Sequence, residues 1–352
     1  MDLSVLGFDS WFEQQSAPLL QPGHSLARVM TVDRGAFIVR HQAGETPAEL
    51  AGKMRFASES VVDMPCVGDW VCVQGLASGG RAVIHSVVPR KTILRRKRPG
   101  KAVEFQMIAA NIDIAFIIQA CEYDFNLARL DRYLAMAREG AIEPWTILTK
   151  TDLVSQEQLD QLLAQVRSTG FSAHVLALSN LTGAGLAEFR ALLLPGKTCC
   201  LLGSSGVGKT TLINRLLGSD EFDTRAVSES GEGVHTTSRR QLHVLENGAM
   251  LIDTPGMREL GLLGTGDGVD TTFDDIRGIA AGCRFADCTH AGEPGCAVRQ
   301  AVEAGTLSKD RYESFRKLKK ENDFHDLSYG EKRRKDRSFG RFIKSAKKSL
   351  ED

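Results

Sequence analysis

The sequence has no net charge, because its 352 residues include 44 basic and 44 acidic side chains. The average charge therefore points to no class of partner, and only the local distribution of charge can do so. No apolar run approaches the roughly 18 residues that a membrane-spanning helix needs, so we expect no membrane partner. The first residues have no basic stretch and include Asp9 and Glu13, which disfavours a secretory signal.

Eight cysteines would allow disulfide bonds, but their positions disfavour them. Cys199 and Cys200 lie side by side in a short apolar run, and three others cluster with a histidine. A chain that stays in the reducing cytoplasm and holds one metal ion explains this usage better than a disulfide framework.

The clustered cysteines follow the pattern C-x4-C-x-H-x5-C, with Cys283, Cys288, His290 and Cys296 as the ligands. Three thiolates and one imidazole complete a tetrahedral Zn²⁺ site, which is structural because no position stays open for water. The alternative is a group of buried thiols beside an unrelated histidine. A module around residues 282–295 has little core, so zinc would contribute much of its folding energy.

The strongest motif is Gly-Ser-Ser-Gly-Val-Gly-Lys-Thr at residues 203–210, which fits G-x-x-x-x-G-K-[ST]. An apolar run at 198–202 precedes it and a helical pattern at 211–217 follows, an arrangement that a chance glycine-rich turn does not explain. Backbone N–H groups and the positive helix end then surround a phosphate. The predicted nucleotide-binding residues here are Gly203, Ser204, Ser205, Gly206, Val207, Gly208, Lys209, Thr210 and Thr211.

Strands and helices alternate around this motif. Apolar runs predict strands and helical periodicity predicts helices between them, with strands at 112–120, 144–148, 174–178 and 198–202 and helices at 127–138, 156–167 and 186–193. This alternation predicts a doubly wound α/β sheet with right-handed crossovers over residues 102–263.

Two loops of this sheet carry a predicted guanine site. Thr149-Lys150-Thr151-Asp152 is similar to the Asn-Lys-x-Asp motif of GTPases, in which the aspartate accepts hydrogen bonds from the guanine ring N–H and amino group. Thr149 replaces the usual asparagine and loses one hydrogen-bonding atom, which bears on nucleotide affinity rather than on base choice. Ser179-Asn180, after the next strand, matches the loop that offers a backbone N–H to the guanine carbonyl.

The order of these motifs is unusual. The guanine loops precede the phosphate loop, whereas a segment typical of a switch I (residues 228–237) and the D-x-x-G sequence from Asp253 to Gly256 follow it. The sequence therefore predicts a circularly permuted GTPase domain.

Residues 25–101 have short alternating runs at 28–30, 37–40, 71–73 and 81–88, which predict a small β-barrel. An OB-fold is the favoured version, with another small β-domain as the alternative. Residues 1–24 are an N-terminal extension with a short helix at 10–15.

At 90–101 seven basic residues occur without an acidic one, which favours RNA contact over a solvated face.

Residues 264–352 form the predicted zinc-binding helical module with a helix at 311–321 and a basic tail. At 332–348 nine basic residues accompany a single acidic one, and two phenylalanines lie among them. This pattern is typical of a segment that folds on RNA, with an ordinary solvated tail as the alternative.

Barrel, permuted GTPase domain, cysteine module and basic tail together resemble the ribosome small-subunit-dependent GTPase A family (RsgA, also called YjeQ). The resemblance implies GTP hydrolysis stimulated by the 30S subunit, contact with 16S rRNA, late subunit maturation and release after hydrolysis. It also implies Lys209 on the phosphates, Thr210 and either Thr236 or Thr237 on Mg²⁺, Asp253 supporting the metal, and the Gly256 amide at the γ-phosphate. Because Met257 stands where many GTPases have glutamine, the family points to His235 as the residue that positions water; a structural switch histidine is the alternative.

Two other functions fit parts of the sequence. One is a permuted GTPase that acts on another RNA target, and the other is an RNA-binding module with a regulatory nucleotide site. The phosphate-loop residues disfavour the second of these, and the barrel and cysteine module disfavour the first. No dimerisation pattern is evident, so we expect a monomer.

Overall fold

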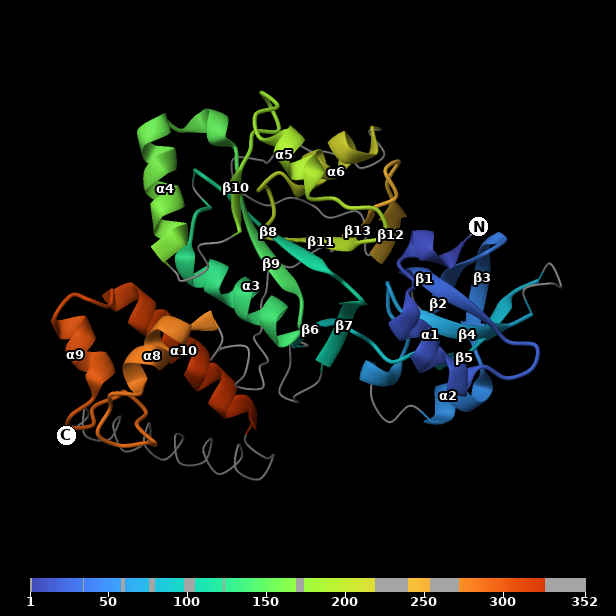
Figure 1. Ribbon diagram of the computed structural model, residues 1–352, viewed down its shortest axis with the longest axis horizontal. Coiled ribbons are helices and arrows are strands. Elements are labelled where there is room, and N and C mark those ends of the chain that lie inside the picture. The colour runs from blue at the N-terminus through green and yellow to red at the C-terminus, as the bar shows by residue number, and fades with distance from the viewer. Residues whose placement is uncertain are drawn as a thin grey trace, which may run out of the picture. The chain divides into compact units, whose positions relative to one another are not determined.

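The computed structural model describes residues 2–33, 35–57, 61–75, 80–97, 105–122, 124–168, 174–218, 240–253 and 272–326. The chain forms two compact units, Met1–Gly261 and Leu262–Asp352. The first unit contains a β-barrel and a larger α/β sheet, and the second is helical (Figure 1). None of the helices in the described ranges is long and apolar enough to cross a membrane.

The barrel has the strand order β1-β2-β3-β5-β4, and β4 pairs again with β1 to close it. β3 and β5 are parallel, whereas the other neighbours are antiparallel. This closed five-stranded barrel confirms the predicted OB-fold. Its strands are β1 (Ser25–Asp33), β2 (Ala36–His41), β3 (Gly44–Leu50), β4 (Trp70–Gln74) and β5 (Ala82–Val87).

The barrel core follows the two-residue period of its strands. Val71 and Val73 of β4 belong to the same buried cluster as Ala27 and Val29 of β1, because alternate side chains of a strand share a face. On the other face of β4, Trp70 is covered by the N-terminal segment. That segment includes a 3₁₀ turn (Leu3–Leu6) and α1 (Ser10–Ser16). Phe8, between the two, and Phe12 of α1 pack on the Trp70 ring.

The α/β sheet has the strand order β10-β9-β8-β11-β13-β12. All neighbours are parallel except β12, which is antiparallel to β13. This arrangement confirms the predicted doubly wound sheet. Its strands are β8 (Ile114–Ala120), β9 (Glu143–Thr149), β10 (Val175–Ala177), β11 (Thr198–Leu202), β12 (Arg240–Val244) and β13 (Met250–Asp253).

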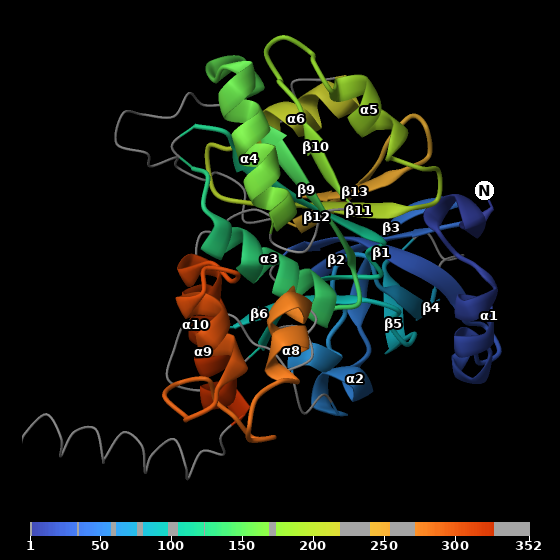
Figure 2. The ribbon, with the colours of Figure 1, turned by 60° about the vertical axis from the view of Figure 1, so that its left-hand side comes forward.

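Both faces of this sheet are buried, which explains the continuous apolar runs of its strands. Cys200 and Leu202 of β11 face one cluster, with α3 (Leu127–Glu139) and α4 (Gln156–Ser168). Cys199 and Leu201 face the other, with α5 (Leu186–Ala191) and α6 (Lys209–Leu217). Figures 1 and 2 show these two helix pairs on opposite faces of the sheet.

The barrel and the sheet are hydrogen-bonded to each other. β12 pairs with β1 through Thr31 opposite Gln241 and Val32 opposite Arg240. Part of the basic segment at 90–101 forms a strand, because β6 (Ile93–Lys97) pairs with β7 (Phe105–Ala110).

The described part of the second unit contains α8 (Asp274–Ala280), α9 (Ala297–Glu303) and α10 (Lys309–Asp326). Its small core includes Phe273 and Phe315, whose ring centroids lie 5.3 Å apart. Arg311 is buried, donates to Asp275 at 3.0 Å and lies over the Phe273 ring. The basic tail at 332–348 lies outside the described residues.

Candidate functional site

The loop between β11 and α6 has the backbone that a phosphate-binding loop requires. Gly203, Gly206 and Gly208 all have positive φ angles, a conformation that glycine adopts without steric cost. A side chain at Gly203 would collide with the carbonyl oxygen of Ile118 on β8. α6 begins at Lys209, so its unpaired N–H groups and positive end face the loop.

Lys209 folds back over this loop and donates to the carbonyl oxygens of Gly203 (2.7 Å) and Ser204. Asp124, in the loop after β8, hydrogen-bonds with Ser204 and interacts electrostatically with Lys209. Burial raises the pKa of Asp124, and the charge of Arg129, 2.7 Å away, partly offsets this increase. Thr210 and Thr211 are exposed on the first turn of α6.

Two side chains join the predicted guanine loops to the phosphate loop. The Thr149 hydroxyl, at the end of β9, is fully buried and lies 2.7 Å from the carbonyl oxygen of Val207. The Asn180 amide nitrogen, after β10, donates to the carbonyl oxygen of Gly208 at 3.0 Å. The structure therefore brings together the three loops that the sequence analysis assigned to one nucleotide.

The carboxylate of Asp152 is also held in place. It is the second residue of a 3₁₀ turn (Thr151–Leu153), which Lys150 precedes in the left-handed conformation. The buried hydroxyl of Ser179 donates to its Oδ1 atom and accepts hydrogen bonds from the N–H groups of Leu181 and Thr182, both at 3.1 Å. A fixed, exposed carboxylate is suited to two parallel N–H donors from a base.

Some predicted site residues are not placed by the structure. His235, Thr236, Thr237 and Gly256 lie outside the described residues. Asp253 ends β13, where its backbone pairs with Gln241 of β12. Because β11 and β13 are parallel neighbours, Asp253 lies at the same sheet edge as the phosphate loop.

The four predicted metal ligands are together in the second unit, where their ligand atoms lie within 4.8 Å of one another. The Nδ1 atom of His290 is 3.6 Å from the Cys283 sulfur and 3.5 Å from the Cys296 sulfur, and these two sulfurs are 4.0 Å apart. Zn–S bonds of about 2.3 Å and Zn–N bonds of about 2.0 Å in a tetrahedron place ligand atoms about 3.5–3.8 Å apart. The cluster therefore has the donors and spacing to hold one metal ion.

Neighbouring residues orient the histidine of this cluster. His290 has a φ of 59°, and its carbonyl oxygen accepts a hydrogen bond from the Tyr312 hydroxyl on α10. The Glu293 carboxylate accepts from the N–H groups of Thr289 and Ala291, at 2.9 Å each, and so closes the turn around His290. Hydrogen bonds from the Gly292 N–H and the Thr289 hydroxyl hold the pKa of Glu293 well below its usual range.

Several side chains of the basic segment bind within the protein. The Arg90 side chain is only 9% exposed and forms an ion pair with the fully buried Asp69 at 2.8 Å. Burial lowers the pKa of Arg90, but the hydrogen bonds and charge of Asp69 outweigh this effect and raise it. Arg95 pairs with Glu139 on α3 at 2.8 Å, and Lys91 pairs with Asp9. Only part of the positive charge at 90–101 is therefore free to face another molecule.

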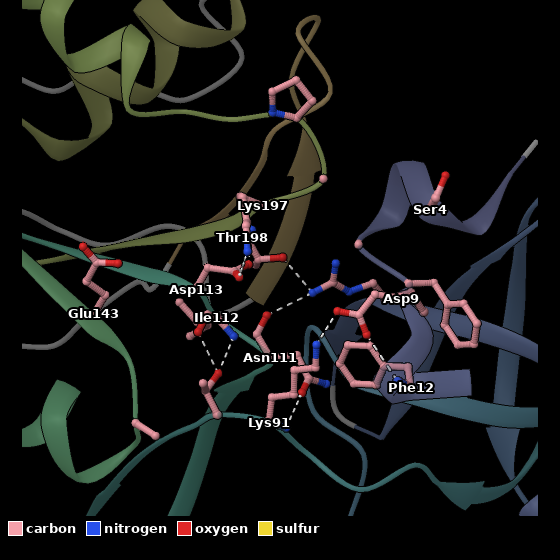
Figure 3. Close-up of a pocket in the computed structure, with 17 residues that line it drawn as sticks. Ser4, Asp9, Phe12, Lys91, Asn111, Ile112, Asp113, Glu143, Lys197 and Thr198 are labelled. Carbon is pink, nitrogen blue, oxygen red and sulfur yellow. Dashed lines mark hydrogen bonds and ion pairs between the residues drawn. The ribbon is translucent and has the colours of Figure 1, made fainter. Parts of the chain in front are cut away.

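A cavity of about 490 Å³ lies at the opposite edge of the sheet, where β8 and β11 begin. Four of its charged groups form two ion pairs, and Figure 3 shows the pair of Lys91 with Asp9. Lys197 pairs with Asp113 at 2.8 Å. Sequence reasoning did not predict this cavity, and its paired charges mark it as the joint between the N-terminal segment, barrel and sheet.

Arg28 of the barrel is the centre of this joint. Its side chain is fully buried and donates to carbonyl oxygens of Leu6, Gly68 and Asn111 and to the hydroxyl of Thr198. Burial lowers its pKa to about 10, so the guanidinium remains charged at neutral pH. Nothing in the local sequence distinguishes Arg28 from a surface arginine, apart from its position in an apolar run.

Sequence reasoning also missed residues beside the phosphate loop. Gln119 of β8 exchanges two hydrogen bonds with the backbone of Asn126, at 3.1 and 2.9 Å. Asn126 caps α3 by accepting from the Arg129 N–H. An asparagine directly before a helical pattern is a recognised N-cap signal, and it would have marked the loop that contains Asp124.

Known proteins resemble this chain along most of its length. A family model described as RsgA GTPase matches residues 87–263. A small ribosomal subunit biogenesis GTPase RsgA of Opitutus terrae is 41% identical over 331 residues, which are 91% of this chain and 90% of that protein. The protein of the same description from Streptomyces coelicolor is 40% identical over 91% of this chain and 86% of its own length.

Two solved structures share the fold. YjeQ from Thermotoga maritima has a TM-score of 0.63 at 24% identity and matches 84% of this chain and 97% of its own. YloQ, described as a circularly permuted GTPase, has a TM-score of 0.60 at 24% identity over 87% and 97% of the two chains. These matches confirm the permuted arrangement that the motif order predicted. With a family model over about half of the chain and relatives about 40% identical along about nine-tenths of it, the chain belongs to the RsgA GTPase family.

Proposed function

We propose that this protein hydrolyses GTP on the small ribosomal subunit during late maturation, contacts 16S rRNA and leaves after hydrolysis. The observation that carries the proposal is the junction of three loops. Thr149 and Asn180 join both guanine loops to the phosphate loop, and Ser179 holds the Asp152 carboxylate. Relatives described as small ribosomal subunit biogenesis GTPases support the biological role.

The nucleotide lies across these loops in the proposed complex. Asp152 accepts hydrogen bonds from the guanine ring N–H and amino group, which adenine does not offer in that arrangement. The Lys150 stem lies against the base. The phosphate-loop N–H groups and Lys209 hold the β- and γ-phosphates, for which Lys209 exchanges its present carbonyl partners for phosphate oxygens.

The exposed hydroxyl of Thr210 fits a Mg²⁺ ligand, with Thr236 or Thr237 and Asp253 completing the support of the ion. When bound, Mg²⁺ neutralises charge that develops on the phosphate oxygens. His235 positions the attacking water in this proposal, and the Gly256 N–H contacts the γ-phosphate. We expect His235→Ala to lower GTP turnover far more than GTP affinity, and unchanged turnover would remove His235 from the mechanism.

The metal of the second unit is zinc in this proposal. Three thiolates with one imidazole favour Zn²⁺ over harder cations, and four protein ligands leave no position for catalysis. Cys283, Cys288, His290 and Cys296 would hold it, and its role is to stabilise the small fold around them.

The barrel with its basic segment and the basic tail bind rRNA in this proposal, and the protein acts as a cytoplasmic monomer. The decisive experiment measures hydrolysis of GTP and ATP by the full chain with 30S subunits, with 50S subunits and alone. We expect GTP turnover to rise only with 30S subunits. Equal stimulation by 50S subunits would favour a permuted GTPase with another RNA target. Binding of GTP without turnover would favour an RNA-binding module with a regulatory nucleotide site.

A further inference from the structure

Asn180 belongs to a predicted guanine loop, and its side chain contacts the phosphate loop. Its side-chain nitrogen donates to the carbonyl oxygen of Gly208, the residue directly before α6. The contact is close, because a Cβ atom at Gly208 would lie only 2.9 Å from this nitrogen. The Asn180 amide is therefore set against the backbone of the phosphate loop.

Thr149 has no donor left for a base. A hydroxyl carries one hydrogen, and both neighbours of Thr149 Oγ1 are carbonyl oxygens, that of Val207 at 2.7 Å and that of Gln119 at 3.2 Å. The side chain is fully buried. An asparagine at this position would have a second N–H group to donate, whereas the only hydrogen of the hydroxyl is donated to a backbone carbonyl oxygen of the protein.

A guanine bound through Asp152 still needs donors on its other edge. That edge presents O6 and N7, which are both acceptors. A backbone N–H at position 180 accounts for O6, as predicted from the loop motif. N7 then requires a side-chain donor close to the same loop, and position 149 cannot supply it.

The Asn180 amide, unlike the Thr149 hydroxyl, has a second hydrogen that it can donate to the base. A primary amide has two N–H groups, and the structure gives this nitrogen one partner among the described residues, Gly208. Its Oδ1 atom is buried without a hydrogen-bond partner in the described part of the chain. A buried amide oxygen without a partner costs stability, so folding alone does not account for this side chain.

We infer that the Asn180 side chain is a base-recognition group, which donates one N–H to Gly208 and the other to N7 of guanine. This inference rests on the proposed function, because it assumes that guanine binds at Asp152. Asn180 thereby supplies the hydrogen bond that the replacement of asparagine by Thr149 removes. Since adenine also has an N7 atom, the contact adds affinity, whereas the choice of guanine stays with Asp152.

The test compares GDP with 7-deaza-GDP, in which a C–H group replaces N7. Titration calorimetry on the full chain should show that the wild-type protein binds GDP about tenfold more tightly, the effect of one hydrogen bond. Asn180→Ala should lower GDP affinity and bring the ratio of the two affinities close to one. Asn247→Ala is the matched control, because Asn247 also donates to a backbone carbonyl, that of Leu193, but in the turn before β13; it should leave the ratio unchanged.

Restoring the second amide should restore the contact. Thr149→Asn in the Asn180→Ala background should raise the ratio again, and a ratio that stays near one would contradict the exchange of roles between the two positions. Equal binding of GDP and 7-deaza-GDP by the wild-type protein would overturn the inference without any substitution. If the wild-type protein bound ADP as well as GDP, the proposed function would fail, and this inference with it.

Discussion

The hydroxyl of Thr149 lies 2.7 Å from the carbonyl oxygen of Val207, so a buried hydrogen bond joins the end of β9 to the phosphate loop. A second bond, from Asn180 to Gly208, joins the end of the three-residue strand β10 to the same loop. These bonds fix the spacing between the base-binding and phosphate-binding parts of the site before a nucleotide arrives. Such preorganisation raises affinity because less order has to be created on binding.

Thr149→Val should therefore weaken GDP binding although residue 149 does not touch the base. Valine has the same shape but leaves the Val207 carbonyl unpaired, so we expect the free energy of unfolding to fall by about 1–2 kcal/mol. GDP affinity should fall by about three- to tenfold. Urea unfolding and calorimetry measure the two effects. Thr149→Ser keeps the hydroxyl and should retain GDP affinity; an equal loss in both variants would assign the effect to packing.

The parts of the site that follow local rules could be predicted from the sequence. The phosphate loop, the guanine loops and the metal ligands have fixed residue types at fixed spacings, because a phosphate, a base and a metal ion each require particular donors. The sheet could be predicted as well, because strands buried on both faces, such as β8 and β11, are continuous apolar runs in the sequence.

The parts that depend on contacts distant in sequence could not be predicted. β3 was missed because only Ala48 of its seven residues is buried, so its sequence lacks the apolar alternation that marks a strand. The charge of Arg28 is satisfied by residues 22 to 170 positions away, which no window of sequence contains. The basic segment was recognised from its composition, but the pairing of its side chains with Asp69, Glu139 and Asp9 depends on the folded chain.

Arg28→Met should destabilise the first unit strongly. Methionine fills much of the space but leaves the carbonyl oxygens of Leu6 and Asn111 buried without the donors that Arg28 supplies, and each such group costs about 1–3 kcal/mol. We expect the free energy of unfolding to fall by about 3 kcal/mol or more in a urea titration. Arg81→Met is the control, since Arg81 pairs with Glu49 on the surface at 3.8 Å and should cost less than about 1 kcal/mol. Similar losses in both variants would contradict the role of Arg28 in the joint.

Residues of the basic segment should separate into structural and RNA-binding groups. Arg90→Gln leaves Asp69 buried without its partner, so we expect a loss of about 3–5 kcal/mol in stability. Replacing Arg98 and Lys101 together by alanine should instead lower the slope of log K against log salt for 30S binding by about 1.8, or about 0.9 for each charge removed. An unchanged slope in this double variant would place the RNA contact elsewhere.

Metal removal should affect the second unit before the first. We expect one zinc ion per chain by elemental analysis, and Cys288→Ser should lower this content and loosen the fold around α8 and α9. Hydrogen exchange would show faster exchange there, with the β8–β11 core unchanged. Cys72→Ala, a substitution in the barrel, should leave one zinc ion per chain. Full metal content in Cys288→Ser would exclude this cysteine as a ligand.

The cysteines of the first unit should resist alkylation across the neutral range. Burial raises the pKa of Cys199 to about 12 and that of Cys121 to about 11. Because the thiolate is the reactive form, a thiol with a pKa of 11 is ionised in only about one molecule in a thousand at pH 8. Mass spectrometry after iodoacetamide treatment of the zinc-loaded protein should therefore find both thiols unmodified at pH 8. In urea their pKa values return to the ordinary range and both should react; rapid labelling of the native protein at pH 8 would contradict their burial.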